Sequence, residues 1–167
     1  MDVKRKSVRR AGKPTRKLLH FPECGLDNVY LANGWRSHDT PIGRLLQIKD
    51  DHNLIATLAR HIVEQPYQPS GRELRYLRIY LNLSTVKLGE LFGLNDLQVV
   101  RWEKEICKIK PATFRLLSLL VRERIGQPIN IEAGLRTAAA NDKRPRSKRL
   151  PRVVAFRRSG WKTKAAA

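Results

Sequence analysis

Residues 78–103 read RIYLNLSTVKLGELFGLNDLQVVRWE, and this stretch decides the fold that the sequence predicts. Apolar residues recur three or four positions apart on both sides of Gly93-Leu94-Asn95. Residues at that spacing lie on one face of a helix. Gly93 can adopt a left-handed backbone conformation at little cost, so the chain can turn sharply there. The stretch therefore predicts two short helices joined by a tight turn, with Leu88, Leu91, Val99, Trp102 and Ile106 facing inward.

Capping and turn residues divide residues 70–126 into four expected helices. Ser and Asn side chains accept hydrogen bonds from the free amides of a first helical turn, and Ser70 with Glu73 has the spacing of a capping box. Pro needs no amide partner at the first helical position, and Gly is common just after a helix ends. The expected helices begin at Ser70, Ser84, Asn95 and Pro111, and the last one ends at Gly126.

Residues 18–69 have a less regular pattern, which we interpret as a small α/β extension. Short apolar runs at 18–21, 29–31 and 45–48 lie among turn residues and predict strands. A helix is expected from about Asp51, because an apolar stripe recurs at helical spacing until Pro66 and Pro69. That stripe consists of Ile55, Leu58, Ala59, Ile62 and Val63. A weaker helix is expected within 131–140.

Several spacings within residues 71–122 agree with one known family. The segments Leu83-Ser84, 88–93 and 99–103 resemble the Xre-type helix-turn-helix of phage repressors, Cro proteins and many bacterial antitoxins. Residues 23–34 resemble the extension before this element in MqsA-like antitoxins. Family members that bind zinc carry paired CxxC motifs, whereas this chain has only Cys24 there. The resemblance implies a mainly α fold with a small N-terminal β element and a phage-repressor-like helix-turn-helix domain over 70–126.

The resemblance also implies which residues contact DNA. Arg101 would bond a guanine edge, Asp96 would accept from cytosine, and Leu97 would pack on a thymine methyl group. Asp96 has a second explanation, since an acid in the first turn also suits the positive end of the helix dipole. Arg78 and Glu103 occupy positions that pair in the family. The expected DNA-binding set is Ser84, Thr85, Asn95, Asp96, Leu97, Gln98, Arg101, Lys104 and Lys108.

The charge of the chain is concentrated at its two ends. Residues 1–17 hold eight Lys or Arg and one acid, and residues 141–167 hold ten and one, so the ends carry +16 of the formal net charge of +19. Basic segments attract nucleic acid by neutralising phosphates, and the absence of an apolar stripe disfavours a membrane surface. We expect a disordered basic arm over 1–17 and a C-terminal extension with a basic tail over 127–167. Their alternative role is only to keep the chain in solution.

Other chemistries find little support in the sequence. The four histidines, Cys24 and Cys107 follow no known metal-ligand spacing, so neither a metal nor a cofactor is expected. An enzyme is not expected, because the chain has no nucleophile elbow, P-loop or dinucleotide glycine motif. No apolar run is long enough to span a bilayer, and no hydrophobic signal segment follows the basic start. We therefore expect a cytoplasmic protein associated with the bacterial nucleoid.

Three functions fit these observations. The favoured one is a sequence-specific DNA-binding transcriptional regulator, a repressor that could also be an antitoxin autoregulating a toxin-antitoxin operon. The alternatives are a general nucleic-acid or RNA-binding protein, and a protein-interaction module that neutralises a toxin. RNA binding more usually shows exposed aromatic residues on a sheet, and the body of this chain is poor in those.

A homodimer on a palindromic operator is expected, since one short helix offers few base contacts. The apolar surface of the helix that begins at Pro111 supports this, because Leu116, Leu119 and Leu120 extend it beyond a single stripe. The helix expected from Asp51 could cover the same surface instead.

Overall fold

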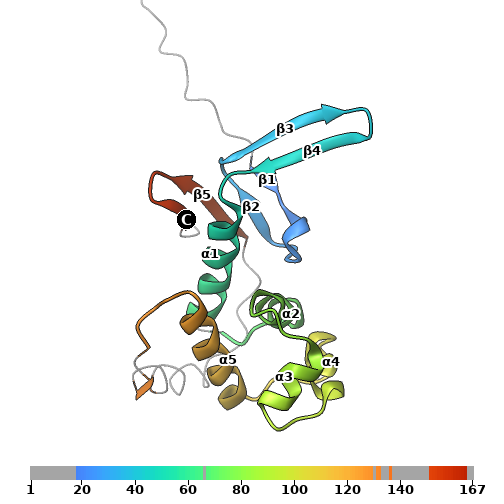
Figure 1. The fold of residues 1–167 in the computed structure, drawn as a ribbon, viewed down its shortest axis with the longest axis vertical. Coiled ribbons are helices and arrows are strands. Elements are labelled where there is room, and N and C mark those ends of the chain that lie inside the picture. The colour runs from blue at the N-terminus through green and yellow to red at the C-terminus, as the bar shows by residue number, and fades with distance from the viewer. Residues whose placement is uncertain (1–17, 66, 130, 133–135, 137–150, 165–167) are drawn as a thin grey trace, which may run out of the picture.

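The computed structural model describes residues 18–65, 67–129, 131–132, 136 and 151–164. Strands lie at one end of the molecule and helices α2 to α5 at the other, with α1 between them (Figure 1). The helices are α1 (Asp51–Glu64), α2 (Gly71–Tyr80), α3 (Thr85–Leu91), α4 (Asp96–Glu103) and α5 (Pro111–Arg124). The strands are β1 (Leu19–His20), β2 (Val29–Leu31), β3 (Trp35–Thr40), β4 (Gly43–Ile48), β5 (Arg152–Arg157) and β6 (Gly160–Thr163).

The predicted fold class, mainly α with a small N-terminal β element around a phage-repressor-like domain, is wrong. The described residues form five α-helices and two sheets with six strands in all, so the fold is mixed α/β. Three strands were not predicted: β3, and β5 and β6, whose residues were expected to belong to a basic extension. The predicted arm over 1–17 and most of the helix expected within 131–140 lie outside the described residues.

The larger sheet joins segments that are far apart in the sequence. Its strand order is β1-β2-β5-β6, with β2 and β5 parallel and the other neighbours antiparallel. One face carries Leu31, Val154 and Trp161, all buried, and α1 packs against β6. Strands β3 and β4 form a separate antiparallel hairpin that extends away from the body (Figure 1).

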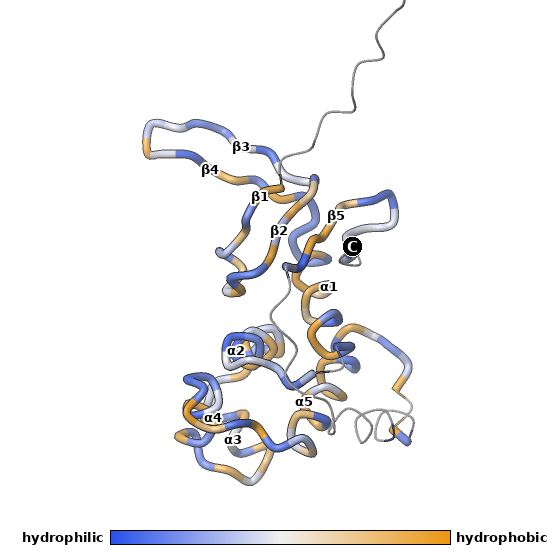
Figure 2. The backbone as a smooth tube through the Cα atoms, turned by 180° about the vertical axis from the view of Figure 1, so that it is seen from behind, coloured by the Kyte–Doolittle hydropathy of each residue, from blue (hydrophilic) through white to orange (hydrophobic). Residues whose placement is uncertain are grey.

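The predicted helices form close to their expected limits, except that α4 ends before Ile106, and most inward positions are confirmed. Hydrophobic residues occur along α1 and part of β5, as well as on the other helices (Figure 2). Leu58, Ala59, Ile62 and Val63 are buried, whereas Ile55 is 38% exposed. Leu54 is buried in place of Ile55, so the buried stripe of α1 includes Leu54, Leu58 and Ile62, four residues apart. The buried positions in the other predicted helices are Leu74, Leu77, Leu88, Val99, Trp102, Leu117 and Val121.

Two further inward positions were predicted wrongly. Leu91 and Ile106 are both exposed. Helix α4 ends at Glu103, so Ile106 lies in the loop that follows and not on the helical stripe. Leu91 is the last residue of α3, where the chain already turns toward α4.

A buried ion pair connects β5, near the C-terminal end of the described chain, to α2 in its middle. Arg152 on β5 donates a hydrogen bond to Glu73 on α2, and both side chains are almost fully buried. Glu73 also accepts from the Ser70 amide at 2.6 Å, which completes the predicted capping box. Arg152 donates to the Tyr67 hydroxyl at 2.7 Å. Burial alone would lower the pKa of Arg152, but the charge and hydrogen bond of Glu73 outweigh it and raise the pKa.

His61 makes the stability of this region depend on pH. Burial, with the nearby charge of Arg152, lowers the pKa of His61 from 6.5 to about 4. The unfolded chain therefore takes up a proton before the folded chain does, and stability is lost as pH falls from about 6.5 to about 4.

His61→Gln should lose less stability than the wild type over that interval, because glutamine takes up no proton. Urea unfolding at pH 7 and pH 4.5 measures this difference, and His52→Gln, at an exposed position of the same helix, is the control. An equal loss in wild type and His61→Gln would contradict the prediction.

Helix α5 packs against α1, which covers part of its apolar surface. This is the alternative that the sequence left open for that surface. Leu119 and Leu120 are half-buried, and Leu116 remains 50% exposed. Within the described residues, none of the helices is both long and apolar enough to cross a membrane.

Candidate nucleic-acid interface

Helices α3 and α4 are joined by the sharp turn that the sequence predicted. The Ser84 hydroxyl accepts from the Lys87 amide at 3.0 Å, and the Asn95 side chain accepts from the Gln98 amide at 3.0 Å, so both predicted caps form. Gly93 has a φ of +65°, which is the left-handed conformation that glycine adopts most readily. A Cβ on Gly89 would lie 2.7 Å from the Leu94 carbonyl oxygen, so the turn folds tightly back onto α3.

The predicted pair of Arg78 and Glu103 is confirmed, and it connects α2 to α4. Arg78 Nε lies 2.6 Å from Glu103 Oε1, and Arg78 Nη2 lies 3.2 Å from Glu103 Oε2. Arg78 Nη1 also donates to the Leu83 carbonyl oxygen at 2.8 Å, at the residue before the Ser84 cap. Two parallel charge-assisted hydrogen bonds fix orientation as well as distance. One side chain therefore orients both ends of the α3–α4 unit relative to α2.

Helix α4 presents an exposed face opposite its buried one. Val99 and Trp102 are buried, while Leu97 is 57% exposed and Arg101 and Lys104 are also exposed. Leu97, Arg101 and Lys104 are spaced four and three residues apart, so they share one side of the helix. We call these three residues the α4 face. It combines one apolar and two cationic side chains.

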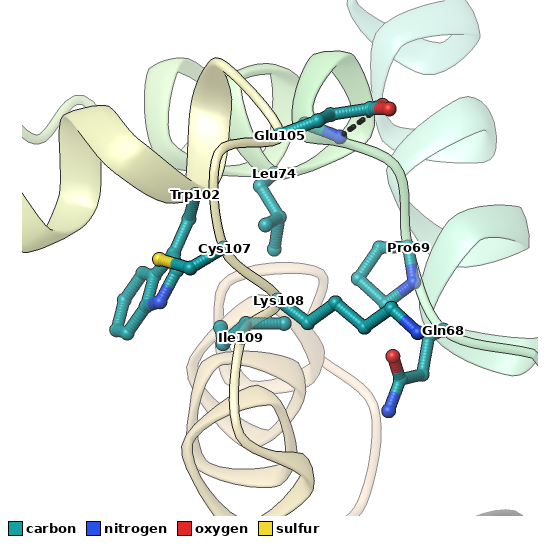
Figure 3. A pocket seen from close by; sticks show the side chains of 9 residues that line it. Gln68, Pro69, Leu74, Trp102, Glu105, Cys107, Lys108 and Ile109 are labelled. Carbon is teal, nitrogen blue, oxygen red and sulfur yellow. Dashed lines mark hydrogen bonds between the residues drawn. The ribbon is translucent and has the colours of Figure 1, made fainter.

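The other predicted site residues lie outside the α4 face. Asp96 and Thr85 are half-buried, and the Ser84 and Asn95 side chains serve as caps. Gln98, expected in the DNA-binding set, turns toward the following loop and donates to Cys107 Sγ at 3.1 Å. The side chain of Lys108 extends toward Gln68 and lines a small pocket (Figure 3).

The loop after α4 carries a contact that the sequence did not indicate. Glu105 Oε1 accepts from the Gly71 amide at 3.0 Å, beside a small pocket lined by Leu74, Trp102 and Ile109 (Figure 3). A Cβ on Gly71 would collide with the Glu103 carbonyl oxygen. The end of α4 therefore packs directly on the start of α2. In the sequence, a glycine directly after the Ser70 cap was the only sign of this close packing.

The cysteines of the described chain do not form a disulfide, and burial raises the pKa of Cys24. Among the described residues, no group of three or more His, Cys, Asp or Glu side chains could hold a metal ion.

Comparison of the chain with protein-family models, curated proteins and solved structures finds no match.

Proposed function

We propose that the chain is a sequence-specific DNA-binding transcriptional regulator that inserts α4 into the major groove of double-stranded DNA. The observation that carries the proposal is the α4 face, which lies opposite the buried Val99 and Trp102. An α-helix with its side chains is about 10–12 Å across, and the major groove is about 12 Å wide. A helix held at the end of the molecule by its opposite side can enter that groove (Figure 1).

The side chains of the α4 face match the chemistry of the groove. An arginine can donate two hydrogen bonds to the O6 and N7 atoms of guanine, and a leucine can pack on the methyl group of thymine. Lys104, at the end of the helix, would bind a backbone phosphate. The resemblance of residues 71–122 to Xre-type helix-turn-helix domains supports the same arrangement. A regulator of this kind acts on the genome, so we place the chain with the bacterial nucleoid in the cytoplasm.

A homodimer is part of the proposal. One helix with three exposed contact residues reads few base pairs, and a two-fold pair would set two such helices about one DNA turn, roughly 34 Å, apart. The half-exposed Leu116 on α5 offers an apolar position for such contact. The site on DNA would then be a palindrome.

Footprinting tests this proposal directly. The full chain should protect two half-sites, one helical turn apart, on DNA from upstream of its own gene. Absence of any protected sequence there and in a randomised duplex library selected against the protein would contradict the proposal.

Arg101→Ala should weaken binding to the selected duplex by about 1–3 kcal/mol while leaving binding to random duplex nearly unchanged. Arg101 is exposed on the α4 face, and no ion pair joins it to another described residue. Arg75→Ala removes the same charge from an exposed position on α2 and is the control. Fluorescence anisotropy at fixed salt measures both affinities. Equal losses on selected and random DNA would show that Arg101 contacts only phosphate.

A further inference from the structure

Among the described residues, the side chains of the four-stranded sheet divide into a buried inner face and a less buried outer face. Side chains alternate between the faces of a strand, and directly paired residues share a face. Leu31, Val154 and Trp161 lie on the inner face, and all three are buried. Tyr30 pairs with His20 and with Val153, so these three lie together on the opposite, outer face. Lys162 pairs with Ala155 and Arg157 with Gly160 on that same outer face.

The outer face runs from aromatic side chains on one edge to cations on the other. His20 and Tyr30 stack with ring centroids 5.0 Å apart and an interplanar angle of 30°. Val153 and the small Ala155 form the middle of the sheet. Lys162 and Arg157 are exposed beyond them. Lys164, whose amide donates to the Val153 carbonyl oxygen at 2.7 Å, extends the row next to Val153 and is also exposed.

The cations are held by a hairpin that is fixed to the body. The Trp161 side chain is buried and its Nε1 donates to the Lys49 carbonyl oxygen at 2.7 Å. The Trp161 amide donates to Asn53 Oδ1 at 2.7 Å, and the Phe156 amide donates to Asn33 Oδ1 at 2.6 Å. The four strands of this sheet contain no acidic residue. The strands of the outer face therefore carry exposed cations and no acid, on the same face as an aromatic pair.

We propose that this outer face binds single-stranded nucleic acid, with a base stacked on the Tyr30 and His20 rings and phosphates at Lys162 and Lys164. Unpaired bases stack on aromatic side chains of open sheets, whereas the bases of a duplex are already stacked on each other. Cations on the far edge of the same face would neutralise the backbone that joins such bases.

The observations favour this occupant over two others. A membrane-binding surface needs large exposed apolar side chains beside its cations. The apolar residues in the middle of the outer face are the half-buried Val153 and the buried Ala155, which offer nothing to insert. A second copy of the chain would bring Lys162 and Lys164 against like charges on the same surface.

The outer face is distinct from the α4 face. The sheet lies at the strand end of the molecule, and α4 lies at the helical end (Figure 1). Single-strand binding by the outer face therefore goes beyond the duplex binding proposed for α4. Experiments can disprove either activity without the other.

Binding of a fluorescein-labelled oligo(dT) of twelve nucleotides by the full-length chain tests the proposal. Tyr30→Leu keeps an apolar side chain but removes the ring, so the affinity should fall about 5- to 150-fold, the range for one stacked base. Tyr30→Phe should keep the affinity. A twelve-base-pair duplex should be unaffected by either change.

A second pair of variants keeps the test independent of folding, since it changes only exposed side chains. K162Q/K164Q should reduce the slope of log affinity against log salt by about 1.4, because each phosphate contact on a single strand contributes about 0.7. R60Q/R75Q removes the same charge from exposed positions on α1 and α2 and should leave the slope unchanged.

Three results would overturn the proposal. The first is equal slopes for the two charge variants, and the second is an unchanged oligo(dT) affinity for Tyr30→Leu. The third is a wild-type dimer that Tyr30→Leu converts to a monomer without changing oligo(dT) affinity, which would assign the face to a second copy. Arg101→Ala should leave oligo(dT) binding unchanged. A loss of duplex binding without a loss of oligo(dT) binding would test only the proposal for α4.

Discussion

Glu73→Met is expected to lower the free energy of unfolding by about 3–5 kcal/mol, because it leaves the Arg152 guanidinium buried without its counter-charge. A guanidinium keeps its proton at any pH that a folded protein tolerates, so Arg152 cannot relieve the cost by becoming neutral. The Tyr67 hydroxyl would remain as a neutral partner. Arg152 Nε already lacks a hydrogen-bond partner among the described residues, so the variant would leave the guanidinium with few hydrogen bonds.

The double variant Glu73→Met/Arg152→Met should recover most of that loss. Apolar side chains of similar length can fill a buried ion-pair site at little cost, whereas an unpaired buried charge cannot be accommodated. Urea unfolding of the two single variants and the double variant measures the coupling energy between the residues. Glu64→Met, at an exposed position on α1, should change stability by less than about 0.5 kcal/mol. A Glu73→Met variant as stable as this control would show that the pair does not hold β5 to α2.

That ion pair also explains why the fold class could not be predicted. Arg152 and Glu73 are 79 positions apart, and the sequence gives no local sign that they meet. The segment 141–167 reads as a basic tail, because Lys and Arg outnumber the apolar residues that mark β5 and β6. The strands form because β2 has an edge that needs a partner, and Val154 and Trp161 complete the core beneath it.

Sequence patterns predicted correctly the contacts between residues that are close together in the chain. Three helices are capped as predicted, by Ser70, Ser84 and Asn95. This hydrogen bond is local, because the side-chain oxygen and the amide that donates to it are only three residues apart. The Arg78 and Glu103 pair came from a family resemblance, which encodes a tertiary contact that spacing alone would not reveal.

The candidate site was predictable in part for the same reason. Leu97, Arg101 and Lys104 follow from helical periodicity. The direction of Gln98 depends on Cys107, and that of Lys108 on the loop after α4, so neither could be predicted. The outer sheet face could not be foreseen at all, because Tyr30 and Lys162 are brought together only by the pairing of β2 with β5.

Gly71→Ala is expected to destabilise the chain by about 1–3 kcal/mol and to weaken binding to the selected duplex. The added Cβ would meet the Glu103 carbonyl oxygen and lie 2.8 Å from that of Trp102. Both obstacles are backbone atoms, so no side-chain rotation can relieve the clash. The end of α4 must then move away from α2, which strains the Arg78 and Glu103 hydrogen bonds and displaces the α4 face.

Gly126→Ala separates this effect from a simple loss of stability. Gly126 has a φ of +74° and nothing within 4 Å of an added Cβ, so alanine there costs about 1–2 kcal/mol of backbone strain and no clash. It lies after α5, away from α4. Both variants would be compared by thermal unfolding and by duplex anisotropy well below their melting temperatures. Gly71→Ala should lose duplex affinity and Gly126→Ala should not. Equal affinities would mean that the position of α4 against α2 does not control how the chain reads DNA.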